Sequence, residues 1–181
     1  MMLSSSISEE KILKKVKQME DSLKRDFKIR KPKIAVLGLN PHSGDKGVIG
    51  TEDDNIITPA VKKAFNSGSL VYGPYSADGF FASDIFTQFD AILAMYHDQG
   101  LIPFKNMSFS KGVNYTAALP VVRTSPDHGT AYDLAGKNLA RASSFREAVY
   151  MACHIFKNRS EFLMLQKNPL ILTSASHKKS Q

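Results

Sequence analysis

Two histidines, His42 and His97, occupy equivalent places in the sequence, each just after an apolar run. The runs, residues 33–39 and 89–96, are typical of strands buried in a parallel sheet. Because ligands bind beyond the carboxyl ends of strands in open α/β sheets, both imidazoles could point into one crevice. Neutral imidazole is the commonest protein ligand for zinc and similar cations. The pair therefore indicates a metal site, and the alternative for each histidine is a solvated loop side chain.

Lys105, Asn114 and Arg123 form a second group of candidate binding residues. Arg123 closes an apolar strand, where an unpaired guanidinium would be costly to bury, so it needs an anionic partner. An internal carboxylate and a substrate phosphate or carboxylate both satisfy this need. Lys105 follows Pro103 on an expected turn or helix and is the weaker member of the group.

The segment 124–138 has the composition of a nucleotide-binding loop. Its glycines allow a ligand close to the backbone, and His128, Asp133 and Asn138 offer groups suited to a base and a ribose. It lacks the G-x-G-x-x-G pattern, so it gives no Rossmann signal. A structural turn is the alternative.

Composition places the chain among globular proteins. It has 181 residues, of which 43% are hydrophobic and 23% charged, enough for one domain with a sizeable core. The net charge of +7 lies largely near the two ends of the chain and does not favour nucleic-acid binding. No apolar run approaches the roughly 20 residues of a membrane helix. The single cysteine, Cys153, excludes an internal disulfide framework, and we expect a cytoplasmic protein.

Four elements are expected in the first half of the chain. A capping box at residues 6–9 begins a helix whose apolar residues recur at helical spacing up to Phe27. Residues 33–39 form a buried strand, and a long loop follows over 40–55. Thr58 then caps a short helix that Gly68 ends.

The second half continues the alternation of strands and helices. A second buried strand covers 89–96, and two further strands, 112–119 and 121–124, are split at Pro120. After a loop over 127–137, a capping box from Ser144 to Glu147 begins a last helix that runs to about residue 158. This alternation predicts an α/β fold.

Five motifs in order resemble the 4-hydroxythreonine-4-phosphate dehydrogenase family. They are Leu-Asn-Pro-His-Ser-Gly-Asp (39–45), Gly-Thr-Glu (50–52), Met-Tyr-His-Asp-Gln-Gly (95–100), Gly-Val-Asn (112–114) and Arg-Thr-Ser-Pro-Asp-His-Gly-Thr-Ala (123–131). The resemblance implies NAD- or NADP-dependent oxidation of 4-phosphooxy-L-threonine, followed by decarboxylation, in the biosynthesis of pyridoxal 5'-phosphate. It also implies a divalent metal (zinc, magnesium or cobalt) held by three histidines.

The resemblance assigns roles residue by residue. His42 and His97 match two of the metal ligands, whereas Lys105, Asn114 and Arg123 match residues that hold the substrate. The loop 127–138 is similar to the adenosine-binding loop of isocitrate and isopropylmalate dehydrogenases, which implies cofactor contacts at His128 and Asn138. No residue is assigned as the catalytic acid or base.

The resemblance further implies an isocitrate/isopropylmalate dehydrogenase-like layered sheet with flanking helices, incomplete because the N-terminal half is absent. That half supplies the third histidine in the family. Residues 1–167 are expected to be the C-terminal half of the dehydrogenase, and 168–181 a flexible tail. The expected partners are a phosphorylated small molecule, a second copy in a homodimer with the site at the interface, and a separate N-terminal half.

Two alternatives remain. Val48 stands where many relatives have a histidine, so the substrate could be another phosphorylated hydroxy acid. The chain could also be a non-catalytic domain that keeps the phosphate and nucleotide contacts.

Overall fold

The computed structural model describes residues 4–108, 111–127, 129, 132–139 and 141–169. The helices are α1 (Glu9–Asp26), α2 (Thr58–Asn66), α3 (Ala77–Ala82), α4 (His97–Ser108) and α5 (Ser143–Gln166). The strands are β1 (Lys33–Leu37), β2 (Leu70–Tyr75), β3 (Ala91–Leu93), β4 (Val113–Tyr115) and β5 (Thr124–Pro126). Short helical turns are η1 (Ser4–Ser6), η2 (Pro41–Gly47), η3 (Asp53–Ile57), η4 (Asp84–Gln88) and η5 (Tyr132–Leu134).

Strand β1 lies at the centre of a three-stranded parallel sheet of order β2-β1-β3. Ile34 and Val36 pack on one face and Ala35 and Leu37 on the other, and all four are buried. The prediction of a strand buried on both faces is confirmed, although β1 ends at Leu37 rather than Leu39. The α/β class is also confirmed.

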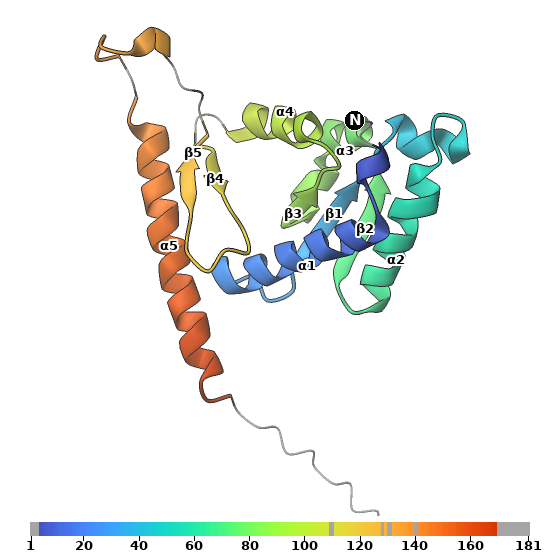
Figure 1. The fold of residues 1–181 in the computed structure, drawn as a ribbon, viewed down its shortest axis with the longest axis horizontal. Coiled ribbons are helices and arrows are strands. Elements are labelled where there is room, and N and C mark those ends of the chain that lie inside the picture. The colour runs from blue at the N-terminus through green and yellow to red at the C-terminus, as the bar shows by residue number, and fades with distance from the viewer. Residues whose placement is uncertain (1–3, 109–110, 128, 130–131, 140, 170–181) are drawn as a thin grey trace, which may run out of the picture.

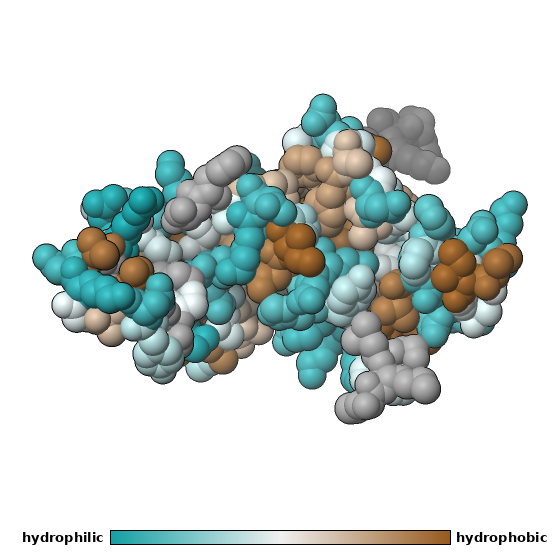
Figure 2. Space-filling model, turned by 90° about the horizontal axis from the view of Figure 1, so that it is seen from above, coloured by the Kyte–Doolittle hydropathy of each residue, from teal (hydrophilic) through white to brown (hydrophobic). Residues whose placement is uncertain are grey.

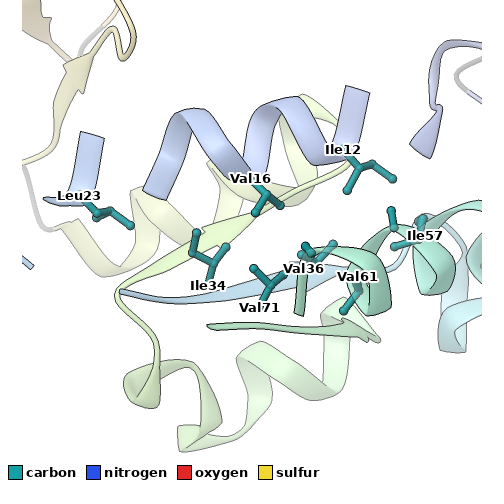
Figure 3. Close-up of a cluster of buried hydrophobic side chains, with 10 residues drawn as sticks. Ile12, Val16, Leu23, Ile34, Val36, Ile57, Val61 and Val71 are labelled. Carbon is teal, nitrogen blue, oxygen red and sulfur yellow. The ribbon is translucent and has the colours of Figure 1, made fainter. Parts of the chain in front are cut away.

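The larger core lies between the sheet and helices α1 and α2 (Figure 3). Helix α1 contributes Ile12, Val16 and Leu23, which stack over Ile34 and Val71 of the sheet. Each large apolar side chain buried here stabilises the fold by roughly 1.5–3 kcal/mol. The predicted apolar face of α1 therefore holds the helix on the sheet.

Strand β2 was missing from the sequence prediction. It contains Gly73 and Pro74, joined by a cis peptide bond, and both residue types are rare in strands. Pro74 is tolerated because β2 is an edge strand. Gly73 is required because a Cβ there would lie 2.3 Å from the carbonyl oxygen of Val36 on β1.

Three predicted helix starts were wrong in position. Helix α1 is capped by Ser8, whose hydroxyl accepts from the Lys11 N–H, and not by a box that begins at Ser6. Helical winding before α2 already starts in η3, so Thr58 is not an N-cap. Helix α5 has no side-chain cap at Ser144 and continues past residue 158 to Gln166. Local capping therefore sets the start of α1 only, two residues later than predicted.

The last part of the chain forms a separate layer beside the sheet (Figure 1). Strands β4 and β5 pair antiparallel, with Asn114 opposite Ser125, and α5 packs along them. Two strands were expected here, but the second begins at Thr124 and not at Val121. The strand predicted at 89–96 is short and half-buried. Within the described part of the chain, no helix has the length and apolar character needed to cross a membrane.

Candidate functional site

The chain leaves β1 through a clamp built on Asp53, which is buried at the start of η3. Its carboxylate accepts hydrogen bonds from the backbone N–H groups of Leu39 (2.8 Å) and Asn40 (3.0 Å) and from the Asn40 side chain (2.9 Å). Gly38 makes room for it, since a Cβ there would lie 2.7 Å from the carboxylate. The clamp fixes the direction in which the loop leaves the sheet.

Beyond the clamp, five consecutive residues from His42 to Lys46 adopt left-handed backbone angles, with φ between 44° and 87°. Four of them are not glycine, and such angles cost energy for residues with a Cβ. The loop is closed by the Ile49 N–H, which donates to the Gly44 carbonyl at 3.1 Å. This turn places His42 on the surface beyond the carboxyl end of β1.

Gln99 joins the ends of the two neighbouring strands β1 and β3. Its side-chain oxygen accepts from the Met95 N–H at 2.8 Å, and its amide nitrogen donates to the Gly38 carbonyl at 2.7 Å. One side chain therefore bridges the segments that precede His42 and His97. Each histidine follows a strand of the parallel sheet, as predicted, and the structure adds that these two strands, β1 and β3, are neighbours.

His97 is the first residue of α4 and its side chain is 78% exposed. Its Nδ1–H donates to the Asp98 carboxylate at 2.7 Å. A carboxylate at one ring nitrogen orients the ring and leaves Nε2 free for a metal, an arrangement common at metal sites. The donor set thus suits a metal ligand at His97.

His42 lies near Asp78 at the start of α3. Hydrogen bonds from Ser76 and from the Gly79 backbone hold the pKa of Asp78 below its ordinary value, and the charge of His42 contributes to this. Among the described residues, no group of three or more His, Cys, Asp or Glu side chains could hold a metal ion. The assignment of His42 and His97 to one metal site stays a prediction.

The three predicted substrate residues lie on or beside the β4–β5 hairpin. Asn114 and Arg123 are both exposed, and the Arg123 guanidinium donates to the Thr116 hydroxyl at 2.8 Å. The expectation of a buried guanidinium was wrong, because the strand end that carries it faces solvent. Lys105 on α4 lies 3.6 Å from the Asp127 carboxylate, at the open end of the hairpin.

The predicted cofactor residues are placed only in part. His128 lies outside the described residues. Asn138 is exposed, with φ of 52°, in the turn that follows η5. This segment projects beyond the start of α5, away from the sheet (Figure 1). The assignment of both residues to a cofactor stays a prediction.

Sequence reasoning missed a buried ionic cluster centred on Asp26, at the end of α1. Its carboxylate is fully buried and pairs with Arg25 and Arg159, and it also accepts from the Tyr115 hydroxyl. Burial acts to raise the pKa of Asp26, but the hydrogen bonds from Arg25, Arg159 and Tyr115 outweigh burial and hold it well below the ordinary value. Asp26 is therefore ionised at neutral pH.

Two of the missed residues carried a usable signal. Asp53 directly follows the Gly-Thr-Glu motif, and Gln99 lies inside the Met-Tyr-His-Asp-Gln-Gly motif, so both belong to segments already singled out. Asp26 gave no such signal, because an acidic residue in a helix rich in lysine is typical of a solvated face.

Taken together, the structure is an α/β chain with imidazole, amide and guanidinium groups at strand ends and on a hairpin. Comparison with known proteins identifies the family within this broad class. The chain belongs to the family of the pyridoxal phosphate biosynthetic protein PdxA, whose sequence profile matches residues 2–152.

Individual relatives agree with this assignment. The chain is 54% identical over 168 residues to a 4-hydroxythreonine-4-phosphate dehydrogenase from Bacteroides thetaiotaomicron, covering 93% of this chain and 46% of the relative. A second relative of that name, from Sulfurihydrogenibium sp., is 53% identical over 82% of this chain and 45% of its own length. The crystal structure of the enzyme from Klebsiella pneumoniae superimposes with a TM-score of 0.73 at 37% identity, over 84% of this chain and 46% of that one. The chain thus spans about half the length of the relatives it matches.

Proposed function

We propose that this chain carries the metal- and substrate-binding half of a 4-hydroxythreonine-4-phosphate dehydrogenase. The enzyme oxidises the hydroxyl of 4-phosphooxy-L-threonine with NAD or NADP, and the product then loses carbon dioxide, in the biosynthesis of pyridoxal 5'-phosphate. The observation that carries the proposal is the pair of strand ends β1 and β3, which Gln99 braces and each of which leads to a histidine. The family assignment supports the same activity.

His42 and His97 would hold the metal through their ring nitrogens. Asp98 orients the His97 ring, and the Asp53 clamp directs the loop that carries His42. When bound, a divalent metal (zinc, magnesium or cobalt) supplies Lewis-acid polarisation of the substrate oxygen. Two protein ligands leave positions open for a further ligand from the rest of the enzyme and for substrate oxygens.

Lys105, Asn114 and Arg123 would bind the phosphorylated substrate. Arg123 presents a planar guanidinium that suits a phosphate or carboxylate, and its bond to Thr116 keeps one edge in place. Asn114 lies on the same hairpin and offers an amide for the polar end of the substrate. Lys105 adds a positive charge beside the open end of the hairpin.

The nicotinamide cofactor would meet the segment that contains His128 and Asn138. Binding there would aim the reacting C–H bond of the substrate at the nicotinamide ring. We place the complete enzyme in the cytoplasm, in keeping with the single cysteine.

Exposed apolar surface supports the view that a further polypeptide segment completes the site. Helix α5 exposes Phe145, Val149, Phe156 and Leu163, which recur at helical spacing on one side. Figure 2 shows apolar side chains in several separate patches among hydrophilic ones. We propose that the part of the family protein that this chain does not match covers such surface and gives an isocitrate/isopropylmalate dehydrogenase-like fold, as a homodimer with the site at the interface.

Titration of the purified chain with 4-hydroxythreonine 4-phosphate in the presence of zinc tests the proposal. We expect binding that Arg123→Ala weakens at least about tenfold, as the loss of a charged hydrogen bond implies. Lys14→Ala, a change of an exposed cation on α1, is the control and should leave the affinity unchanged. Absence of binding, or equal affinity in the Arg123 variant, would contradict the assigned substrate site.

An assay of nicotinamide reduction by the chain alone separates a half-site from a complete enzyme. We expect no turnover, because the described residues provide only a partial metal site. Turnover by the isolated chain would show that the other half is dispensable.

One observation favours a second substrate. Val48 lies in the loop after η2 with 82% of its surface exposed, where it offers no hydrogen bond to a ligand. If another phosphorylated hydroxy acid is the true substrate, the chain should bind it more tightly than 4-hydroxythreonine 4-phosphate in the same titration.

A further inference from the structure

The hairpin that carries the proposed substrate residues has two faces. Side chains alternate along paired strands, and Asn114 lies opposite Ser125 whereas Tyr115 lies opposite Thr124. Asn114 is exposed, and the face of Tyr115 and Thr124 is turned toward α1 and α5. The substrate residues are therefore presented by a surface whose back is fixed to two helices.

The back of the hairpin is held by hydrogen bonds in addition to apolar contacts such as that of the Tyr115 ring with Phe27. The Tyr115 hydroxyl donates to the Asp26 carboxylate on α1, and the Thr124 hydroxyl donates to the Ala148 carbonyl on α5 at 2.8 Å. The Asn158 side chain also donates to the Asp26 carbonyl at 2.7 Å. Each strand is thus tied to one helix, and the two helices are tied to each other.

Arg159 connects the Asp26 carboxylate on α1 to the turn of the hairpin. Its Nε and Nη2 donate to the two Asp26 oxygens at 2.9 and 3.0 Å. Its Nη1 donates to the carbonyls of Leu119 and Pro120, both at 3.2 Å. These two carbonyls lie in the connection that leads from β4 to Arg123, so a single guanidinium links α1, α5 and that connection.

Both members of the pair are buried and fully hydrogen-bonded. Asp26 is 0% exposed and Arg159 is 8% exposed, and no buried side-chain nitrogen or oxygen of the described residues lacks a hydrogen-bond partner. A buried ion pair of this kind often adds no more stability than apolar residues of the same size. Its directional bonds do, however, fix the position of the groups that they connect.

We propose that Asp26 and Arg159 are a positioning pair that sets the hairpin so that Asn114 and Arg123 face the phosphorylated substrate. The inference rests on the proposed function for the identity of that substrate. Neither residue touches the ligand, because both lie on the helix side of the hairpin. Arg25 supplies a second guanidinium to Asp26 and keeps the carboxylate oriented toward Arg159.

Arg159→Lys in the full chain tests the proposal. Lysine keeps the positive charge but cannot reach the carboxylate and both carbonyls at once, since an ammonium lacks the planar fork of arginine. We expect faster amide hydrogen exchange in the hairpin (113–126) with unchanged exchange in β1, and an affinity for 4-hydroxythreonine 4-phosphate weakened at least about tenfold. Lys157→Arg, on the exposed side of α5, is the matched control.

A second variant keeps the proposal testable if the Arg159→Lys chain does not fold. Tyr115→Phe removes one hydrogen bond to Asp26 and keeps the ring packed against Phe27. It should loosen the hairpin and weaken binding in the same direction by a smaller factor. Wild-type exchange and affinity in both variants would overturn the proposal.

The two proposals fail in different ways. If the wild-type chain does not bind 4-hydroxythreonine 4-phosphate, the proposed function fails, and hairpin exchange in Arg159→Lys still decides whether the pair positions the hairpin. If the wild-type chain binds and both variants loosen the hairpin without loss of affinity, the positioning role is wrong and the proposed function stands.

Discussion

The sheet and the hairpin are held in place by different forces. In the sheet, β1 is buried between two layers of apolar side chains, and the core with α1 and α2 is built from Ile, Val and Leu (Figure 3). In the hairpin, each strand has only three residues, and a buried ionic cluster joins it to α1 and α5. Apolar packing depends on close complementarity of many side chains, whereas hydrogen bonds fix the direction between particular groups. The hairpin therefore depends on a few directional bonds, and the sheet on many apolar contacts.

The largest effect is expected for Asp26→Ala. The substitution leaves the Arg159 guanidinium buried without its carboxylate, and breaking a buried pair in this way costs about 3–5 kcal/mol. Urea denaturation measures the loss. Asp21→Ala is the control, because the Lys17–Asp21 pair is exposed and worth roughly 1 kcal/mol or less. Equal losses in the free energy of unfolding of the two variants would show that burial does not increase the contribution of the Asp26 cluster to stability.

A somewhat smaller loss is expected for Ile34→Ala in β1. Ile34 is 1% exposed and packs beneath α1, so truncation should cost about 2–5 kcal/mol. Because no charge is involved, the loss in urea denaturation should be the same at low and high salt. A strong salt dependence would mean that the sheet and the hairpin are not held by different forces.

Asp53→Asn should have a smaller and more local effect. The amide keeps one acceptor but turns a donor toward the N–H groups that the carboxylate accepts, at a cost of about 1–3 kcal/mol. Hydrogen exchange at Leu39 and Asn40 should accelerate while the amides of α5 stay protected. The neighbouring and exposed Asp54→Asn is the control. Unchanged exchange at Leu39 would show that Asp53 does not fix the start of the loop.

The smallest effect at neutral pH is expected from the titration of Asp26, which lowers the stability of the folded chain only in acid. The pKa of Asp26 lies below its ordinary value of 3.8 in the folded chain, so its contribution to stability is fully present above that value. It is lost as the pH falls from about 4 toward the lower folded pKa. The melting temperature of the wild type should therefore fall more steeply below pH 4 than the melting temperature of the Asp26→Asn variant. Parallel curves would contradict the assigned pKa.

Local pattern was enough to predict the strand at 33–39 and the places of His42 and His97, because an apolar run followed by polar residues is a property of one short segment. It was not enough for β2, whose Gly73 and Pro74 fit only beside the β1 backbone. Local pattern could not predict the Asp26–Arg159 pair, since 133 positions separate the two residues in sequence. Contacts of that range are set by the packing of α1 against α5.

We propose that His97 belongs to the metal site of a dehydrogenase that this chain forms together with a further polypeptide segment. The most direct test joins this chain to the part of the Bacteroides thetaiotaomicron relative that it does not match, and follows nicotinamide reduction with 4-hydroxythreonine 4-phosphate, NAD and zinc. We predict turnover that His97→Ala abolishes together with tight metal binding. Turnover and metal content that are unchanged in the His97→Ala variant would contradict the claim.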